Sequence, residues 1–209
     1  LHLPQAVLPQ RGDFLSWLVV MQHYGVPTRL LDWTFSPYVA AYHAVRNLED
    51  CDGELWYFDR QKVKELVRKV YSSTDDAVYE SVTKSLLDAN GRSSGYPKGL
   101  PWITDLHSYQ HNPRLHVQQG AFTVARCVTD DHAKVIGDLA ERALEVNSPL
   151  CLARIKKEAK PEFLHHLRFA NVTGDSLFPD IEGVGRRLAD MVKLEFRSRI
   201  VSWSKGHSH

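Results

Sequence analysis

Residues Gln22–Pro37 have the sequence QHYGVPTRLLDWTFSP. This short stretch contains a histidine, a tyrosine, an arginine, an aspartate and a tryptophan together with threonine and serine hydroxyl groups. One glycine and two prolines in this stretch fix the direction of the backbone. Apolar residues at helical spacing precede it, so we expect a helix over residues 13–25 that Gly25 ends. Residues 29–31 are predicted to form a short buried strand. The stretch therefore folds as helix, tight turn and strand.

A second helix is predicted to begin directly after this strand, with Ser36 as its N-cap and Pro37 in its first position. The polar residues in between gather where a strand ends and a helix begins, and a ligand meets free backbone N–H groups at such a place. Arg29 and Asp32 could equally form a structural salt bridge, and Trp33 could belong to the core. Ligand binding and a structural role are both open at this point.

The stretch Gln22–Pro37 closely resembles the characteristic sequence of the FRG domain family. Two weaker similarities follow at Gln118–Thr123 and Leu177–Gly183, so the three together span most of the chain. The Phe-Arg-Gly motif that names the family is absent, and Gln10–Gly12 lies too close to the main stretch to replace it. We therefore expect that the family's first strand precedes Leu1.

Composition is that of an ordinary globular protein, with 43% hydrophobic and 24% charged residues. The formal net charge is +1, so no global basic field indicates nucleic-acid binding. Cys51, Cys127 and Cys151 are too widely spaced for a disulfide framework or a zinc motif, which favours a reducing, cytoplasmic location. No apolar run approaches the roughly 18 residues of a membrane span. We predict one domain over residues 1–199 and a tail over 200–209.

The remaining pattern mixes strands and helices without regular alternation, which predicts an α+β fold. Strands are expected at 54–58, around 117–125 and at 150–155. Within the second of these, Gly120 indicates a bulge or a close approach. Helices are expected at 37–47, 60–71, 77–90, 131–146 and 161–170, with a last helix through Leu188–Leu194. A glycine-rich and serine-rich loop is predicted at 91–99.

Several kinds of catalytic chemistry lack their usual sequence pattern. His107 and His111 have the spacing of a zinc-binding helix, but no glutamate lies between them and Pro113 follows closely, so no metal is expected. A Gly-x-Ser-x-Gly elbow and phosphate-binding glycine loops are absent as well. The absence of these patterns leaves non-covalent group transfer, a chemistry in which positioning and electrostatics contribute most of the rate.

The FRG family is itself similar to the ADP-ribosyltransferase fold, a mixed sheet flanked by helices, and this resemblance implies NAD as a substrate. It assigns Arg29 to the diphosphate, or to fixing Asp32, and Thr34 and Ser36 to the nicotinamide wall. Further candidates from the same resemblance are Trp33 or Tyr24 for ring stacking, His23 beside them, and Gln119 or Gln118 at the position of the catalytic glutamate.

The glutamine at that position raises a chemical difficulty. Its amide can hydrogen-bond a ribose hydroxyl, but it carries no negative charge to stabilise an oxocarbenium ion. Either Asp32 supplies the carboxylate, or the protein binds a nucleotide without turnover, or the analogy fails. The first alternative predicts an ADP-ribosyltransferase-like enzyme that modifies a DNA, RNA or protein acceptor in a microbial toxin or antiviral-defence role. The second predicts a sensor module that binds a nucleotide or a regulatory partner protein.

A groove for a nucleic-acid acceptor would be basic and aromatic. The central part of the chain contains basic and aromatic residues that could line such a groove: Arg92, Tyr96, Lys98, Trp102 and Arg114. The alternative is that these residues belong to a solvated loop.

Overall fold

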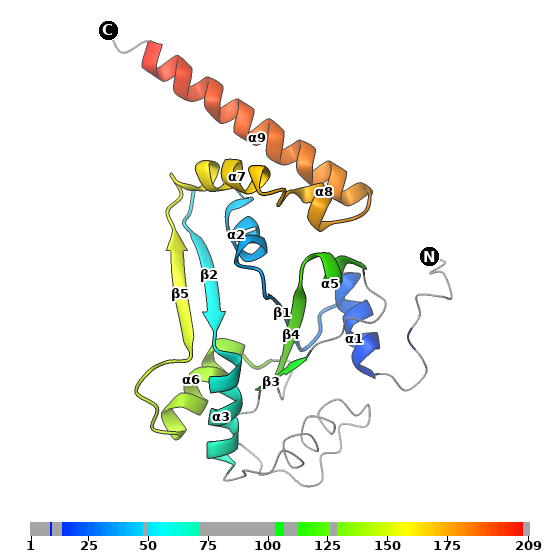
Figure 1. Ribbon diagram of the computed structural model, residues 1–209, viewed down its shortest axis with the longest axis vertical. Coiled ribbons are helices and arrows are strands. Elements are labelled where there is room, and N and C mark those ends of the chain that lie inside the picture. The colour runs from blue at the N-terminus through cyan, green and yellow to red at the C-terminus, as the bar shows by residue number, and fades with distance from the viewer. Residues whose placement is uncertain are drawn as a thin grey trace. The chain divides into compact units, whose positions relative to one another are not determined.

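The computed structural model describes residue 9 and residues 14–47, 50–71, 103–106, 113–125 and 129–206. Figure 1 labels its elements along the chain. The strands are β1 (Leu30–Thr34), β2 (Gly53–Phe58), β3 (Ile103–Leu106), β4 (Gly120–Ala125) and β5 (Leu150–Ile155). The helices are α1 (Phe14–His23), α2 (Pro37–Val45), α3 (Arg60–Val70), α5 (Pro113–Val117), α6 (His132–Arg142), α7 (Lys160–Phe169), α8 (Gly174–Leu177) and α9 (Ile181–Gly206).

The chain divides into two compact units, and the division falls within four of the strands. Unit 1 takes its described residues from Leu1–Trp33, Tyr57–His111 and Ala121–Cys151. Unit 2 takes them from Thr34–Trp56, Asn112–Gly120 and Leu152–His209. Each unit has its own hydrophobic cluster.

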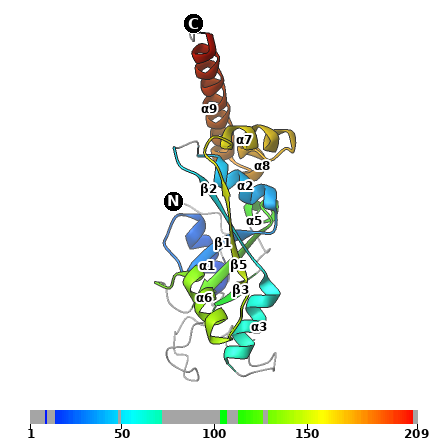
Figure 2. The ribbon, with the colours of Figure 1, turned by 90° about the vertical axis from the view of Figure 1, so that its left-hand side faces the viewer.

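Unit 1 contains most of a three-stranded sheet in the order β1-β4-β3, in which β3 and β4 are antiparallel and Ile103 pairs with Ala125. Helices α3 and α6 pack against each other and against β3 (Figure 2). Asp59 and Asp131 cap these two helices by accepting backbone N–H groups at 2.9 to 3.2 Å. The cluster between them consists of Val63, Leu66, Val67, Ile103, Val135, Ile136, Leu139 and Ala140.

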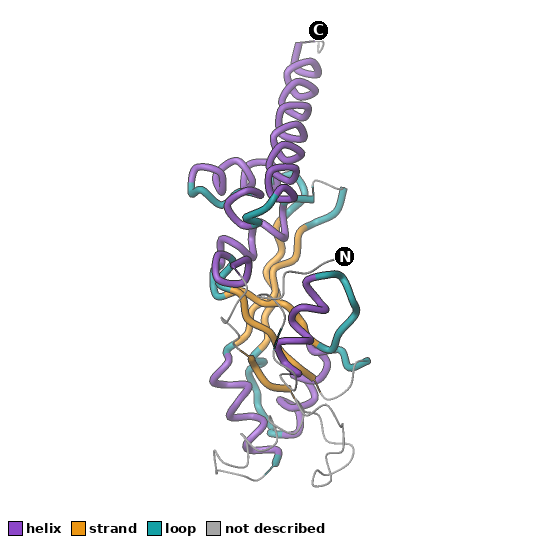
Figure 3. Tube along the Cα trace, turned by 90° about the vertical axis from the view of Figure 1, so that its right-hand side faces the viewer, coloured by secondary structure: helices purple, strands orange, loops and turns teal. Residues whose placement is uncertain are grey.

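Unit 2 contains most of the two-stranded sheet β2-β5 together with helices α2, α5, α7, α8 and α9. Helix α2 packs on α7, and α8 packs on α9. Figure 3 shows α9 as one continuous helix. The buried cluster of this unit consists of Val39, Ala41, Tyr42, Val45, Ile155, Leu164, Leu167, Leu177 and Phe178.

The α+β class predicted from the sequence is confirmed, while the strand arrangement of an ADP-ribosyltransferase is not established by these sheets. Strand β1 runs on to Thr34, beyond the predicted residues 29–31. Three short elements, β3, α5 and α8, were not predicted. Helix α9 continues to Gly206, into residues assigned to a tail.

Some predictions fall on residues that the structure does not describe. These are the helix over 77–90, the loop over 91–99, the histidines His107 and His111, and the groove residues other than Arg114. Among the helices that are described, none is long and apolar enough to cross a membrane.

Candidate functional site

Helix α1 ends where the sequence predicted, because Gly25 closes it. Gly25 has φ +77°, in the left-handed region that favours glycine. Its N–H donates to the Gln22 carbonyl at 2.9 Å, and the Val26 N–H donates to the Met21 carbonyl at 3.0 Å. These are the two hydrogen bonds of a Schellman motif. The turn after α1 is therefore fixed by backbone geometry.

Four of the predicted site residues in unit 1 lie between the last residue of α1 and the middle of β1. His23 and Tyr24 are exposed, and their rings meet edge to face with 5.1 Å between centroids. Arg29 is half-buried and Asp32 is exposed. Within the described part of the chain, the Asp32 carboxylate forms no ion pair or hydrogen bond, so the alternative of a structural Arg29–Asp32 salt bridge is not realised. Asp32 presents its charge to solvent.

Trp33 is held by a chain of hydrogen bonds in unit 1. Its indole N–H donates to the Thr123 hydroxyl at 2.8 Å, and that hydroxyl lies 2.7 Å from Nδ1 of His132. The indole also meets the Phe58 ring edge to face, with 4.5 Å between centroids. Trp33 therefore has a packing role, which was the structural alternative for this residue, and its stacking on nicotinamide stays a prediction.

The direction of each bond in this chain follows from the donors available. The indole N–H of Trp33 only donates, so the Thr123 oxygen accepts it. The bond between His132 and the Arg29 backbone raises the pKa of the ring, so a ring N–H donates to the Arg29 carbonyl, and we assign this proton to the nitrogen other than Nδ1. In the neutral ring Nδ1 is then an acceptor, and the Thr123 hydroxyl donates to it. Burial lowers the pKa of His132, although the charges of Asp130 and Asp131 act in the opposite direction. His132 is thus neutral at pH 7.

In unit 2, the hydroxyl groups of the two predicted residues Thr34 and Ser36 are both used in hydrogen bonds within the unit. The Thr34 hydroxyl donates to the Gln118 carbonyl at 2.7 Å and accepts the Ser36 N–H at 3.0 Å. The Ser36 hydroxyl caps α2 by accepting the Val39 N–H at 3.4 Å, as the sequence predicted. Both hydroxyls therefore shape the start of α2, and a contact with nicotinamide would come in addition to these bonds.

The two glutamines predicted at the catalytic position differ in their surroundings. Gln118 donates from its side-chain amide to the Leu177 carbonyl at 3.0 Å, which ties α5 to the end of α8. Gln119 has φ +48° at the end of α5, accepts the Phe35 N–H on its backbone carbonyl at 3.0 Å, and exposes its side chain. Gln118 therefore has a structural role, and Gln119 is the one whose side chain a ligand can reach.

A group of arginines surrounds one buried ring in unit 2. Phe178 is only 1% exposed, and the guanidinium carbons of Arg114 and Arg186 lie 4.4 and 3.9 Å from its ring centroid. These are cation–π distances. Arg186 also pairs with Glu182 through its Nε at 2.9 Å. His43 meets the same ring edge to face at 6.1 Å.

The pKa of His43 is lowered, first because its neighbours displace water from the ring and then because Arg46, Arg114 and Arg186 are positive. At pH 7 the imidazole is therefore neutral. Much of the side chain is nevertheless exposed, so a ligand can reach it. Arginines supply the positive charge of this cluster, and His43 supplies an uncharged hydrogen-bonding edge.

Tyr42 and Asp190 form a buried pair between α2 and α9. The Tyr42 hydroxyl donates to Oδ2 of Asp190 at 2.7 Å, and the two residues are 0% and 5% exposed. Burial and this bond raise the pKa of Tyr42. Oδ1 of Asp190 has no hydrogen-bond partner among the described residues. The pair fixes the position of α9 within unit 2 and leaves one oxygen unsatisfied.

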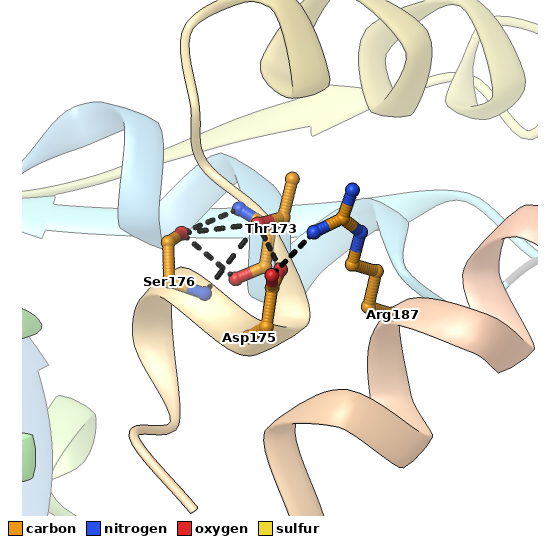
Figure 4. A network of polar contacts seen from close by, with 4 residues as sticks. All are labelled: Thr173, Asp175, Ser176 and Arg187. Atoms are coloured by element: carbon orange, nitrogen blue, oxygen red, sulfur yellow. Dashed lines mark hydrogen bonds and ion pairs between the residues drawn. The ribbon is translucent and has the colours of Figure 1, made fainter.

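A second polar network joins α8 to α9 (Figure 4). Thr173 and Ser176 form a capping box, in which the Ser176 hydroxyl accepts the Thr173 N–H at 2.9 Å. Asp175 accepts from Thr173 and from Arg187 at 2.5 Å each. Leu177 and Phe178, which follow, are buried. The third stretch of sequence similarity therefore has a structural role.

Sequence inspection missed the arginine cluster and the His132 chain. Arg46 and Arg186 stand in ordinary helical sequence, and His132 lies in the first turn of the helix predicted at 131–146. Arg114 stood out only as a groove residue, and Phe178 only within the third stretch of similarity. Among the described residues, no group of histidine, cysteine, aspartate or glutamate side chains could hold a metal ion.

Comparison with known proteins supports one part of the sequence interpretation. The family model of the FRG domain matches residues 4–53, which confirms the resemblance seen in Gln22–Pro37. The match extends from before α1 to the first residue of β2. No curated protein and no solved structure matches the chain significantly.

Proposed function

We propose, on the premise that residues 4–53 are FRG-domain sequence, that this chain uses NAD as a substrate and transfers ADP-ribose to a nucleic acid or a protein. A microbial toxin or an antiviral-defence protein is the setting that this activity suits. The observation that carries the proposal is Asp32, an exposed carboxylate inside the matched segment with no ion pair or hydrogen bond among the described residues.

The chemistry needs little proton transfer before the bond to nicotinamide breaks. The C1′–N bond of NAD cleaves, its electron pair leaves with nicotinamide, and positive charge develops on the ribose. A carboxylate beside that ribose stabilises the charge, which is the electrostatic contribution that dominates such reactions. A nitrogen or oxygen of the acceptor then forms the new bond to C1′ and loses its proton. Asp32 is the residue that we assign to this carboxylate role.

The other predicted residues are assigned to binding. In unit 1, Arg29 would hold the diphosphate, and Tyr24 is exposed enough to stack on a ring, with His23 beside it. In unit 2, Gln119 exposes a side-chain amide that can hydrogen-bond a hydroxyl group. Trp33 of unit 1 and Thr34, Ser36 and Gln118 of unit 2 each form hydrogen bonds within their own unit.

The test is to incubate the protein with NAD and to measure free nicotinamide, with DNA, RNA or protein as the acceptor. Asp32→Asn keeps the size of the side chain and removes its charge, and we expect nicotinamide release to fall at least about 100-fold, as for loss of a group that stabilises a transition state. Glu65→Gln is the matched control, because Glu65 is also an exposed carboxylate of unit 1. Equal release by Asp32→Asn and wild type would refute the role of Asp32.

The second candidate is a module that binds a nucleotide or a partner without turnover. This second candidate is favoured by the structural role of Gln118, whose side-chain amide donates to the Leu177 carbonyl. Calorimetry with NAD separates the two functions. Binding of NAD by wild type without nicotinamide release under any acceptor condition would favour the module, whereas release that depends on Asp32 would favour the transferase.

A further inference from the structure

Cys51 and Lys160 form a contact in unit 2 that the proposed function does not use. Cys51 is exposed, whereas Lys160 is only 2% exposed. The Lys160 ammonium donates to the Asn47 carbonyl at 2.9 Å and lies 4.0 Å from Sγ of Cys51. An accessible thiol is thus placed directly beside a buried positive charge.

The loop that carries Cys51 is fixed on both sides of the thiol. The Asp52 carboxylate accepts the Lys157 N–H at 3.0 Å and the Lys156 ammonium at 3.0 Å. The Lys157 ammonium pairs with Asp50 at 2.7 Å. These contacts tie the residues before and after Cys51 to the segment that leads into α7. The distance between the thiol and Lys160 is therefore maintained by the loop.

One of the Lys160 contacts in the described part of the chain is to a weak acceptor. The ammonium has three N–H donors, and its acceptors among the described residues are one carbonyl oxygen and one sulfur, which accepts hydrogen bonds only weakly. A buried charge is stabilised by strong hydrogen bonds. An oxygen atom bonded to Sγ would lie within reach of Nζ and would be a stronger acceptor than the sulfur.

We propose that Cys51 is a site of reversible oxidation by hydrogen peroxide, and that Lys160 holds the sulfenic acid that forms. The Cys51 sulfur attacks one peroxide oxygen and the thiol gives up its proton, so that the S–O bond forms while the O–O bond breaks. The departing hydroxide takes up the proton released by the thiol and leaves as water. Sulfur loses two electrons and the peroxide gains them. The Lys160 ammonium then donates a hydrogen bond to the new oxygen, and a thiol reductant restores Cys51.

The test uses the reduced full-length protein with a limited amount of hydrogen peroxide and with dimedone, which traps sulfenic acids. Mass spectrometry of the digested protein measures the trapped product at each cysteine, with glutathione in the same sample as a reference thiol. We expect Cys51 to be trapped about tenfold faster than glutathione, because the thiol is exposed and the Lys160 ammonium lies where it can donate to the oxygen that the sulfur gains. Cys151, which is hydrogen-bonded to Tyr57, is expected to be slower.

Two variants assign the effect to Lys160. Lys160→Met is expected to bring the trapping rate at Cys51 down to that of glutathione, whereas Lys193→Met is expected to leave it unchanged. Lys193 is the matched control because it is also a lysine of unit 2 but lies on α9, outside the contacts that hold this loop. A wild-type Cys51 no faster than glutathione would overturn the proposal whether or not Lys160→Met folds. A folded Lys160→Met that is oxidised at the wild-type rate would overturn the role of Lys160.

Discussion

The hydrogen-bond chain through Thr123 gives the sharpest test of the structure. Thr123→Val keeps the shape of a residue that is only 2% exposed and removes its hydroxyl group. The indole N–H of Trp33 and Nδ1 of His132 then lose their shared partner, which they contact at 2.8 and 2.7 Å. Valine offers no replacement donor or acceptor, so both groups become unsatisfied together.

The size of the effect follows from the burial of the three groups. Loss of a hydrogen bond that leaves a buried group unpaired costs about 1–3 kcal/mol. Trp33 and His132 are half-buried, so water can compensate part of the loss at each of them. We therefore expect Thr123→Val to lower the free energy of unfolding by about 1–3 kcal/mol in total.

Urea unfolding followed by far-UV circular dichroism measures this change. Trp33→Phe and the double variant complete a cycle, and the double variant should be less destabilised than the sum of the two by about 1 kcal/mol, because both single changes break the same bond. The indole N–H resonance of Trp33 should also shift in Thr123→Val. A loss below about 0.5 kcal/mol together with additive single effects would refute this chain of bonds.

Three further predictions concern other contacts. Tyr42→Phe should lower the free energy of unfolding by about 1–3 kcal/mol, because it leaves the buried Asp190 carboxylate without its donor. An unchanged free energy in urea unfolding would contradict the hydrogen bond between Tyr42 and Asp190. Gly25→Ala should cost about 1–2 kcal/mol through its positive φ alone, because no atom lies within 4 Å of an added Cβ, and Gly25→Asn should cost less in the same assay. The free energy of unfolding should fall as pH drops below the ordinary histidine pKa of 6.5, because the lowered pKa values of His43 and His132 make the unfolded chain bind more protons there. The part of the decrease that these two histidines cause should be complete below their native pKa values. Urea titrations at several pH values check this, and His43→Gln should flatten the profile.

Elements that local chemistry determines were predictable from the sequence. Gly25 ends α1, Ser36 caps α2, and Asp59 and Asp131 cap α3 and α6, as their residue types indicated. Each of these positions depends on a side chain or a backbone conformation within three residues. The expectation of a close approach at Gly120 is also confirmed, since an added Cβ would lie 2.8 Å from the Leu115 side chain.

Elements that depend on distant contacts were not predictable in the same way. Strand β3 has four residues and is defined by its antiparallel pairing with β4, which no local pattern reveals. Helices α5 and α8 have five and four residues, too few for a periodic apolar pattern. The two arginines over Phe178 come from α9 and from the start of α5, so their meeting is also a tertiary effect.

The three stretches of sequence similarity are joined by hydrogen bonds within unit 2. Thr34, from the first stretch, donates to the carbonyl of Gln118 in the second, and the amide of Gln118 donates to the carbonyl of Leu177 in the third. These polar residues therefore explain one another structurally without any ligand. Asp32 and Tyr24 are different, because both are exposed and neither takes part in these bonds. If the chain acts on NAD, the residues that the fold itself does not require are the ones whose substitution should change activity while leaving stability unchanged.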